Sequence, residues 1–126
     1  MNKKILSWIY VVIWCGIIFF FSSIPDLKIK QLGFWDFVLR KIAHITEYAI
    51  LSILVVRAFR LSTDFSKKKI YVFSTVFSML YALSDELHQY FVPGRHFATT
   101  DLLIDFVGVI IGLIFWDKIF NKTLKI

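Results

Sequence analysis

Cysteine, proline and charged residues are all scarce in this chain, and the scarcity of each narrows what the protein can be. The single cysteine, Cys15, lies within an apolar run, so the sequence contains neither a disulfide framework nor a CxxC motif. No HExxH spacing or other recognised pair of metal ligands occurs, and we expect no metal and no cofactor. No internal repeat, low-complexity tract or second domain interrupts the chain. The sequence therefore predicts one domain spanning residues 1–126.

Apolar residues dominate what remains. Hydrophobic residues make up 58% of the chain and aromatic residues 18%. A soluble domain averages nearer 45–50% apolar residues, and a globule of this size could not bury so much apolar surface. The formal charge of +6 sits in short lysine clusters between apolar runs, which is typical of a membrane protein rather than a nucleic-acid binder. We predict an all-α fold, a polytopic four-transmembrane-helix bundle in the cell membrane.

Four apolar segments define the predicted spans, at about 5–24, 37–59, 70–90 and 101–120. The first run carries no charge, and its length of roughly 30 Å as a helix matches the hydrocarbon thickness of a bilayer. It is too long for a signal peptide, and no small-x-small cleavage site follows it. The prolines mark boundaries, because Pro25 ends the first span and Pro93-Gly94 makes a turn after the third. Asp101 is placed to complement the dipole of the fourth helix in its first turn.

Basic residues predict the orientation of these spans. Four spans place the N-terminus, the 57–69 region and the C-terminus on one side, which then holds ten basic residues against five on the other. The ten are Lys3, Lys4, Arg57, Arg60, Lys67, Lys68, Lys69, Lys118, Lys122 and Lys125, and the five are Lys28, Lys30, Arg40, Lys41 and Arg95. The positive-inside rule therefore predicts that both termini are cytoplasmic.

This topology brings polar residues from three spans to the same depth near the outer face. The second span contributes a stripe of Lys41, His44 and Tyr48, with Glu47 about 60° away from His44. The third contributes Tyr81, Asp85, Glu86, His88 and Gln89, and the fourth contributes Asp101 and Asp105 in line with Gly108 and Gly112. This GxxxG spacing predicts close approach by another helix of the same chain. Ionisable groups inside a membrane are costly, so we expect one shared polar site.

Three of these segments resemble those of the VanZ-like membrane protein family. Residues 41–51 (KIAHITEYAIL) resemble its HxxEY segment, 85–95 (DELHQYFVPGR) its DExxQxFxPxR segment, and 101–108 (DLLIDFVG) its final DxxxD/N-x-x-G helix. The Phe21-Ser22-Ser23 exit of the first span is also similar. The resemblance implies a small multi-span bacterial protein associated with glycopeptide resistance, in particular to teicoplanin. It assigns no chemical activity.

We therefore predict a site that acts on, or binds, a lipid or lipid-linked cell-envelope molecule from the outer leaflet. Histidine and carboxylates suit general acid–base work, and Arg95 suits a phosphate or carboxylate. The predicted catalytic residues are His44, Glu47, Glu86 and Asp101. The predicted substrate-binding residues are Tyr48, Asp85, Gln89, Arg95 and Asp105. The expected partners are membrane lipids, a lipid-linked precursor or an amphiphilic antibiotic, and no nucleic acid.

Two other classes stay open at this point. One is a protein that binds or shields an envelope precursor or antibiotic without turnover. The other is a structural protein whose polar layer serves helix packing, with His44 and Glu47 as an interhelical hydrogen-bonding pair. On this second interpretation Asp85 belongs to a helix end that reaches interfacial water. No serine or cysteine has a clear activating base, which argues against covalent catalysis, and the nearly uncharged inner halves of the spans argue against a transporter.

Overall fold

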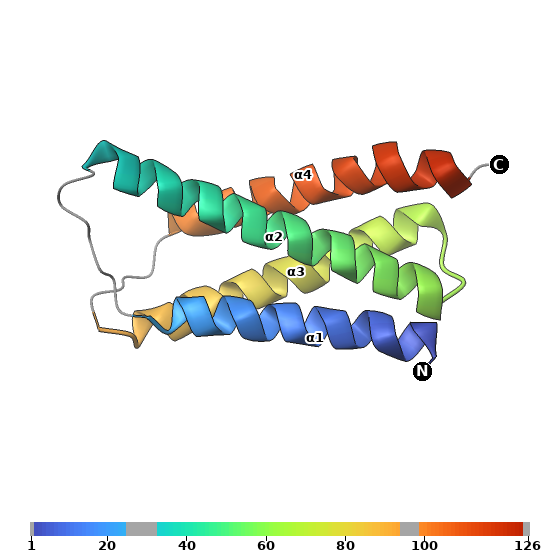
Figure 1. Cartoon of the computed structure of the whole chain (residues 1–126), viewed down its shortest axis with the longest axis horizontal. Helices are drawn as coiled ribbons and strands as arrows, with labels where there is room; N and C mark the ends of the chain where they lie inside the picture. The colour runs from blue at the N-terminus through green and yellow to red at the C-terminus, as the bar shows by residue number, and fades with distance from the viewer. Residues whose placement is uncertain (1, 25–32, 94–98, 125–126) are drawn as a thin grey trace.

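The structure is a computed structural model that describes residues 2–24, 33–93 and 99–124. These residues form four helices and no strand: α1 (Lys3–Ser22), α2 (Phe34–Ser62), α3 (Lys67–Tyr90) and α4 (Thr99–Leu124). Consecutive helices run antiparallel, and the two termini lie at the same end of the bundle as the connection between α2 and α3 (Figure 1). The predicted all-α fold with four helices is confirmed.

The helix limits follow local capping chemistry. The side chain of Asn2 accepts a hydrogen bond from the backbone N–H of Lys4 at 2.8 Å, which starts α1 before the apolar run begins. The Ser66 hydroxyl does the same for Lys69 at 3.3 Å, so α3 begins three residues earlier than the apolar segment. In α4, Asp101 lies in the first turn as predicted.

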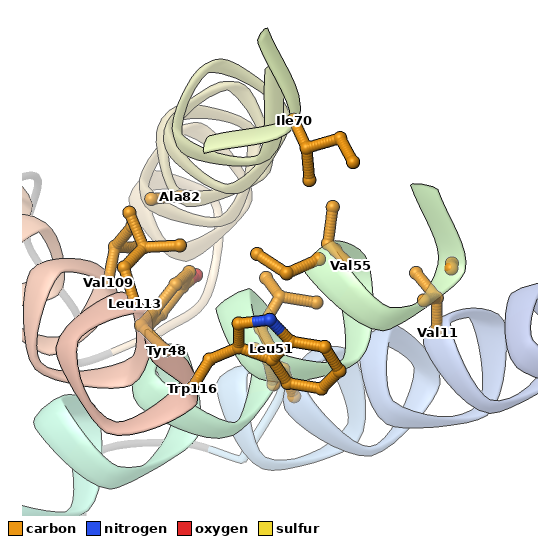
Figure 2. Close-up of a cluster of buried hydrophobic side chains, with 12 residues drawn as sticks. Val11, Tyr48, Leu51, Val55, Ile70, Ala82, Val109, Leu113 and Trp116 are labelled. Atoms are coloured by element: carbon orange, nitrogen blue, oxygen red, sulfur yellow. The ribbon is translucent and has the colours of Figure 1, made fainter. Parts of the chain in front are cut away.

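Helix α2 is the centre of the bundle, because it packs extensively against each of the other three helices, whereas α3 contacts α1 only slightly. It contributes more buried side chains to the core than any other helix, and the other three helices supply the rest (Figure 2). The core consists of Val11, Ile18, Tyr48, Leu51, Val55, Val56, Ala58, Ile70, Ala82, Val109, Leu113 and Trp116. Burial of this cluster holds the polar residues of α2 in register with those of α3 and α4.

The two glycines of α4 let its backbone lie directly against α2. A Cβ atom added to Gly108 would stand 2.6 Å from the backbone oxygen of Ile45. One added to Gly112 would collide with the Ala49 carbonyl and the Ser52 hydroxyl. The prediction that the GxxxG segment faces another helix of the same chain is therefore confirmed.

Large apolar side chains cover the outside of all four helices. Val12 of α1, Ile42 of α2, Leu80 of α3 and Leu103 of α4 are each more than half exposed. By length and composition, α1 and α2 are able to cross a membrane. The remaining two predicted spans, 70–90 and 101–120, stay predictions.

Candidate functional site

The polar stripe of α2 faces aspartates on two other helices. Lys41, His44 and Tyr48 follow one another at roughly one-turn spacing, and each is bonded to a different aspartate. The end of the bundle where α1 and α3 finish and α2 and α4 begin is called the site end (Figure 1). Asp101 and Asp105 lie in the first two turns of α4, and Asp85 lies in the last two turns of α3. Because Asp101 and Asp105 are themselves one turn apart on α4, they match the spacing of their partners on α2.

His44 and Asp105 form the central pair. Nδ1 of His44 lies 3.0 Å from Oδ1 of Asp105, and the Asp105 side chain is 0% exposed whereas that of His44 is 15% exposed. The close approach of Gly108 to α2, one turn along α4 from Asp105, brings the carboxylate within reach of the imidazole. Asp105 is also near enough to Asp85 and Asp101 to interact with them electrostatically.

The deepest pair joins α2 to α3. The hydroxyl of Tyr48 donates a hydrogen bond of 3.1 Å to Oδ2 of Asp85, and both residues are buried. The interpretation of Asp85 as a helix-end residue in interfacial water is wrong. Its turn of α3 packs against α2, and the Tyr48 hydroxyl takes the place of water.

The outermost pair is an ion pair between Lys41 and Asp101, with side chains 27% and 16% exposed. Asp101 therefore has a specific cationic partner on α2 in addition to its position in the first turn of α4. Lys41 also lies 5.2 Å from the centre of the Phe37 ring. Exposure thus falls from Lys41 through His44 to Tyr48, so the site is a polar column that leads inward from the site end.

The other predicted acidic residues and the amide lie beside this column. Glu86 and Gln89 of α3 are buried at 0% and 4% exposure. Glu47 is partly buried and close enough to His44 to interact with it electrostatically. The backbone oxygen of Glu47 accepts a 2.9 Å hydrogen bond from Nε1 of Trp14, which ties α1 to α2 at this level.

His88, by contrast, turns away from the column toward α1. Its Nε2 lies 2.9 Å from the Ser23 hydroxyl, and its ring stacks on Phe19 with centroids 4.4 Å apart. Since the Ser23 hydroxyl donates its one hydrogen to the Phe19 carbonyl at 2.8 Å, it accepts from His88. The predicted stripe of α3 is therefore divided: Asp85 and Gln89 are buried, whereas Tyr81 and His88 bond to α1.

The column unites five of the nine predicted site residues, namely His44, Tyr48, Asp85, Asp101 and Asp105. Arg95 lies outside the described residues. Lys41 belongs to the column although the predicted site did not include it. The signal in the sequence that points to Lys41 as a site residue is its position on the same helical stripe as His44 and Tyr48.

Comparison with known proteins supplies a family for this arrangement. The family model described as VanZ/LLP1 matches residues 7–121, which include all nine predicted site residues. The chain belongs to the VanZ/LLP1 family. Neither the curated proteins nor the solved structures provided a match. An association with glycopeptide resistance is therefore a property of the family to which this protein belongs. The family and the two apolar helices together favour a membrane location.

The central pair of the VanZ/LLP1 chain has the chemistry of a His–Asp dyad. With Nδ1–H donating to ionised Asp105, a neutral His44 carries its lone pair on Nε2. Among the described residues, Nε2 has no hydrogen-bond partner, and His44 is partly exposed. Such an imidazole can take a proton from a bound group and return it. Within the same part of the chain, no three His, Cys, Asp or Glu side chains are grouped as metal ligands.

Proposed function

We propose that this VanZ/LLP1 protein is a single-domain, multi-pass protein of the cell membrane with four spans and both termini in the cytoplasm. At the site end it binds, and acts by acid–base chemistry on, a lipid or lipid-linked cell-envelope molecule. Two observations support the placement. The first is that every helix has large apolar side chains exposed on its outer surface. The second is that the side with the two termini has ten basic residues, whereas the opposite side has five.

The His44–Asp105 pair is the observation that carries this proposal. A buried carboxylate that holds one nitrogen of a partly exposed imidazole, while the other nitrogen has no hydrogen-bond partner among the described residues, is the arrangement of a general base. Packing of α4 against α2 alone needs neither group, since the two glycines already allow that contact. In the proposed mechanism Asp105 orients His44, and Nε2 moves the proton.

Further groups have roles on the substrate side. Lys41 at the exposed top of the column, and Arg95 beyond it in the sequence, supply positive charge for a phosphate or carboxylate. Glu47 and Glu86 are the additional acid–base groups of the proposal, at the sides of the column. Through these contacts the protein contributes to resistance against a teicoplanin-type glycopeptide.

A second candidate function, binding of the same molecule without turnover, is favoured by one feature of the site. Among the described residues, no serine or cysteine side chain is hydrogen-bonded to His44. Acyl transfer through a covalent acyl-enzyme would need such a nucleophile beside the base. Acid–base chemistry on a bound water or substrate hydroxyl does not.

The test replaces His44 by glutamine, with His88→Gln as the matched control. Both changes remove an imidazole from the site end, but only His44 belongs to the dyad. The readout is survival against a teicoplanin-type glycopeptide, normalised to the amount of protein in the membrane. We expect His44→Gln to abolish the protection at normal abundance, because glutamine cannot accept and return a proton, and His88→Gln to retain it.

Two results would contradict the proposal. Full protection by His44→Gln would remove the dyad from the function. Reduced membrane abundance of His44→Gln, with protection per molecule unchanged, would assign His44 to helix packing instead.

A further inference from the structure

Hydrogen-bond acceptors outnumber donors in the column. Each donor side chain on the α2 stripe is already bonded to an aspartate, Lys41 to Asp101, Nδ1 of His44 to Asp105 and the Tyr48 hydroxyl to Asp85. Oδ2 of Asp105 remains, fully buried and without a hydrogen-bond partner among the described residues. Leaving a buried carboxylate oxygen unbonded costs about 1–3 kcal/mol or more. The column therefore lacks a donor at this point.

Charge at the site end points to the same deficiency. The column itself holds three carboxylates, from Asp85, Asp101 and Asp105, and one lasting cation, Lys41. The Arg40 side chain is paired with Asp36 on the same helix and adds no net charge. With His44 neutral, the column is negative, and a bound group that carries positive charge would balance it.

We propose that the column takes the primary ammonium group of a phosphoethanolamine-type lipid head group, with the ammonium donating to Oδ2 of Asp105. This inference rests on the proposed function and names the class of molecule that the site receives. An ammonium carries three N–H donors and no acceptor, which is the complement of what the column offers. A charge-assisted hydrogen bond to a buried carboxylate is among the strongest that a head group can form.

The rest of the column fits the rest of such a head group. Lys41 lies roughly one helical turn, about 5.4 Å, nearer the site end than the level of Asp105, and it keeps N–H donors beyond the one given to Asp101. A phosphate behind the ammonium would meet Lys41 there. For the head group to reach Asp105, the partly exposed Lys41 side chain swings from Asp101 to the phosphate.

A membrane lipid, rather than a free soluble amine, is favoured by the surface around the column. Phe37 and Ile42 of α2 and Leu103 and Phe106 of α4 are exposed apolar side chains on the two helices that carry the central pair. Acyl chains lying against them would stay in an apolar environment while the head group enters. A free amine gains nothing from these contacts.

Three short-chain lipids and one soluble amine test this inference. The full chain, purified in a detergent without amines, is titrated with dihexanoyl phosphatidylethanolamine, phosphatidylcholine or phosphatidylglycerol, and with free ethanolamine. Binding is followed by thermal stabilisation. The choline lipid is the matched probe, because it has the same charges but no N–H. We expect phosphatidylethanolamine to bind at least about tenfold more tightly than the other three.

Asp105→Asn provides the second arm, with Asp64→Asn in the exposed connection between α2 and α3 as its control. Asparagine still accepts from His44 but has no charge for the ammonium. We expect Asp105→Asn to lose the preference for phosphatidylethanolamine over phosphatidylcholine and Asp64→Asn to keep it. Because lipids are compared within each variant, a change in basal stability does not affect this comparison.

The possible failures are distinguishable. The inference would be overturned by equal binding of the ethanolamine and choline lipids, by tighter binding of phosphatidylglycerol, or by equal binding of free ethanolamine. In the first two cases the proposed function would still stand, because the site would still bind a lipid. A preference for phosphatidylethanolamine that survives in Asp105→Asn would overturn the assignment to Asp105. No binding of any probe, together with full protection by His44→Gln, would overturn both this inference and the proposed function.

Discussion

Replacing Gly108 by alanine tests whether the contact between α2 and α4 builds the site. An alanine Cβ would stand 2.6 Å from the Ile45 backbone oxygen, about 0.8 Å inside the 3.4 Å at which ordinary contact begins. The obstructing atoms belong to the backbone of α2, so no side-chain rotation relieves the clash, and α4 must move away. Overpacking of this kind costs about 1–3 kcal/mol, whereas alanine gains about 1 kcal/mol over glycine in helix propensity. We therefore expect Gly108→Ala to lower the free energy of unfolding by up to about 2 kcal/mol.

Gly16→Ala is the matched control for this change. Gly16 also lies in a helix, α1, but a Cβ added there has nothing within 4 Å. Its expected effect is the propensity gain alone, up to about 1 kcal/mol. The assay is the thermal unfolding midpoint of each purified variant in the same detergent. The midpoint should fall for Gly108→Ala and stay level or rise for Gly16→Ala. If Gly108→Ala is as stable as Gly16→Ala, the close packing of α4 on α2 is not a feature of the protein.

Two further predictions concern the deep pair and the topology. Tyr48→Phe leaves the buried Asp85 carboxylate without its tyrosine donor, so we expect the free energy of unfolding to fall by about 1–3 kcal/mol. Thermal unfolding measures this loss, and Tyr90→Phe, at an exposed tyrosine, is the control that should change little. Equal effects of the two substitutions would contradict the role of the Tyr48 hydroxyl. In a chain with Cys15 replaced, Phe97→Cys should react with an impermeant thiol reagent from outside the cell and Asp64→Cys should not, and the reverse labelling would overturn the orientation.

Local patterns were enough to predict the elements and the level of the site. The apolar runs and caps place four helices, and helical spacing puts Lys41, His44 and Tyr48 on one stripe of α2. Alternating helix direction then carries Asp85 and Asp105 to the same end of the bundle. The GxxxG spacing of α4 likewise indicated a close helix contact, and the structure confirms it.

The partners within the site were beyond those patterns. Asp85 and His88 are three residues apart on α3 and share one stripe in the sequence, yet Asp85 bonds to Tyr48 and His88 to Ser23, the residue that follows α1. A helical stripe is wide enough to border two neighbouring helices, so spacing alone cannot assign a residue to either. The packing of α1 and α2 against α3 makes that assignment.

The sequence by itself determined the number of helices, their antiparallel order and the crowding of acidic and basic groups at one end, because periodicity and chain direction are local properties. Only the tertiary structure decided that Asp105 has one bonded and one unbonded oxygen, that Asp85 is buried, and that Lys41 covers the column. These outcomes depend on how closely α4 approaches α2, which is possible because neither Gly108 nor Gly112 has a side chain to hold the two helices apart.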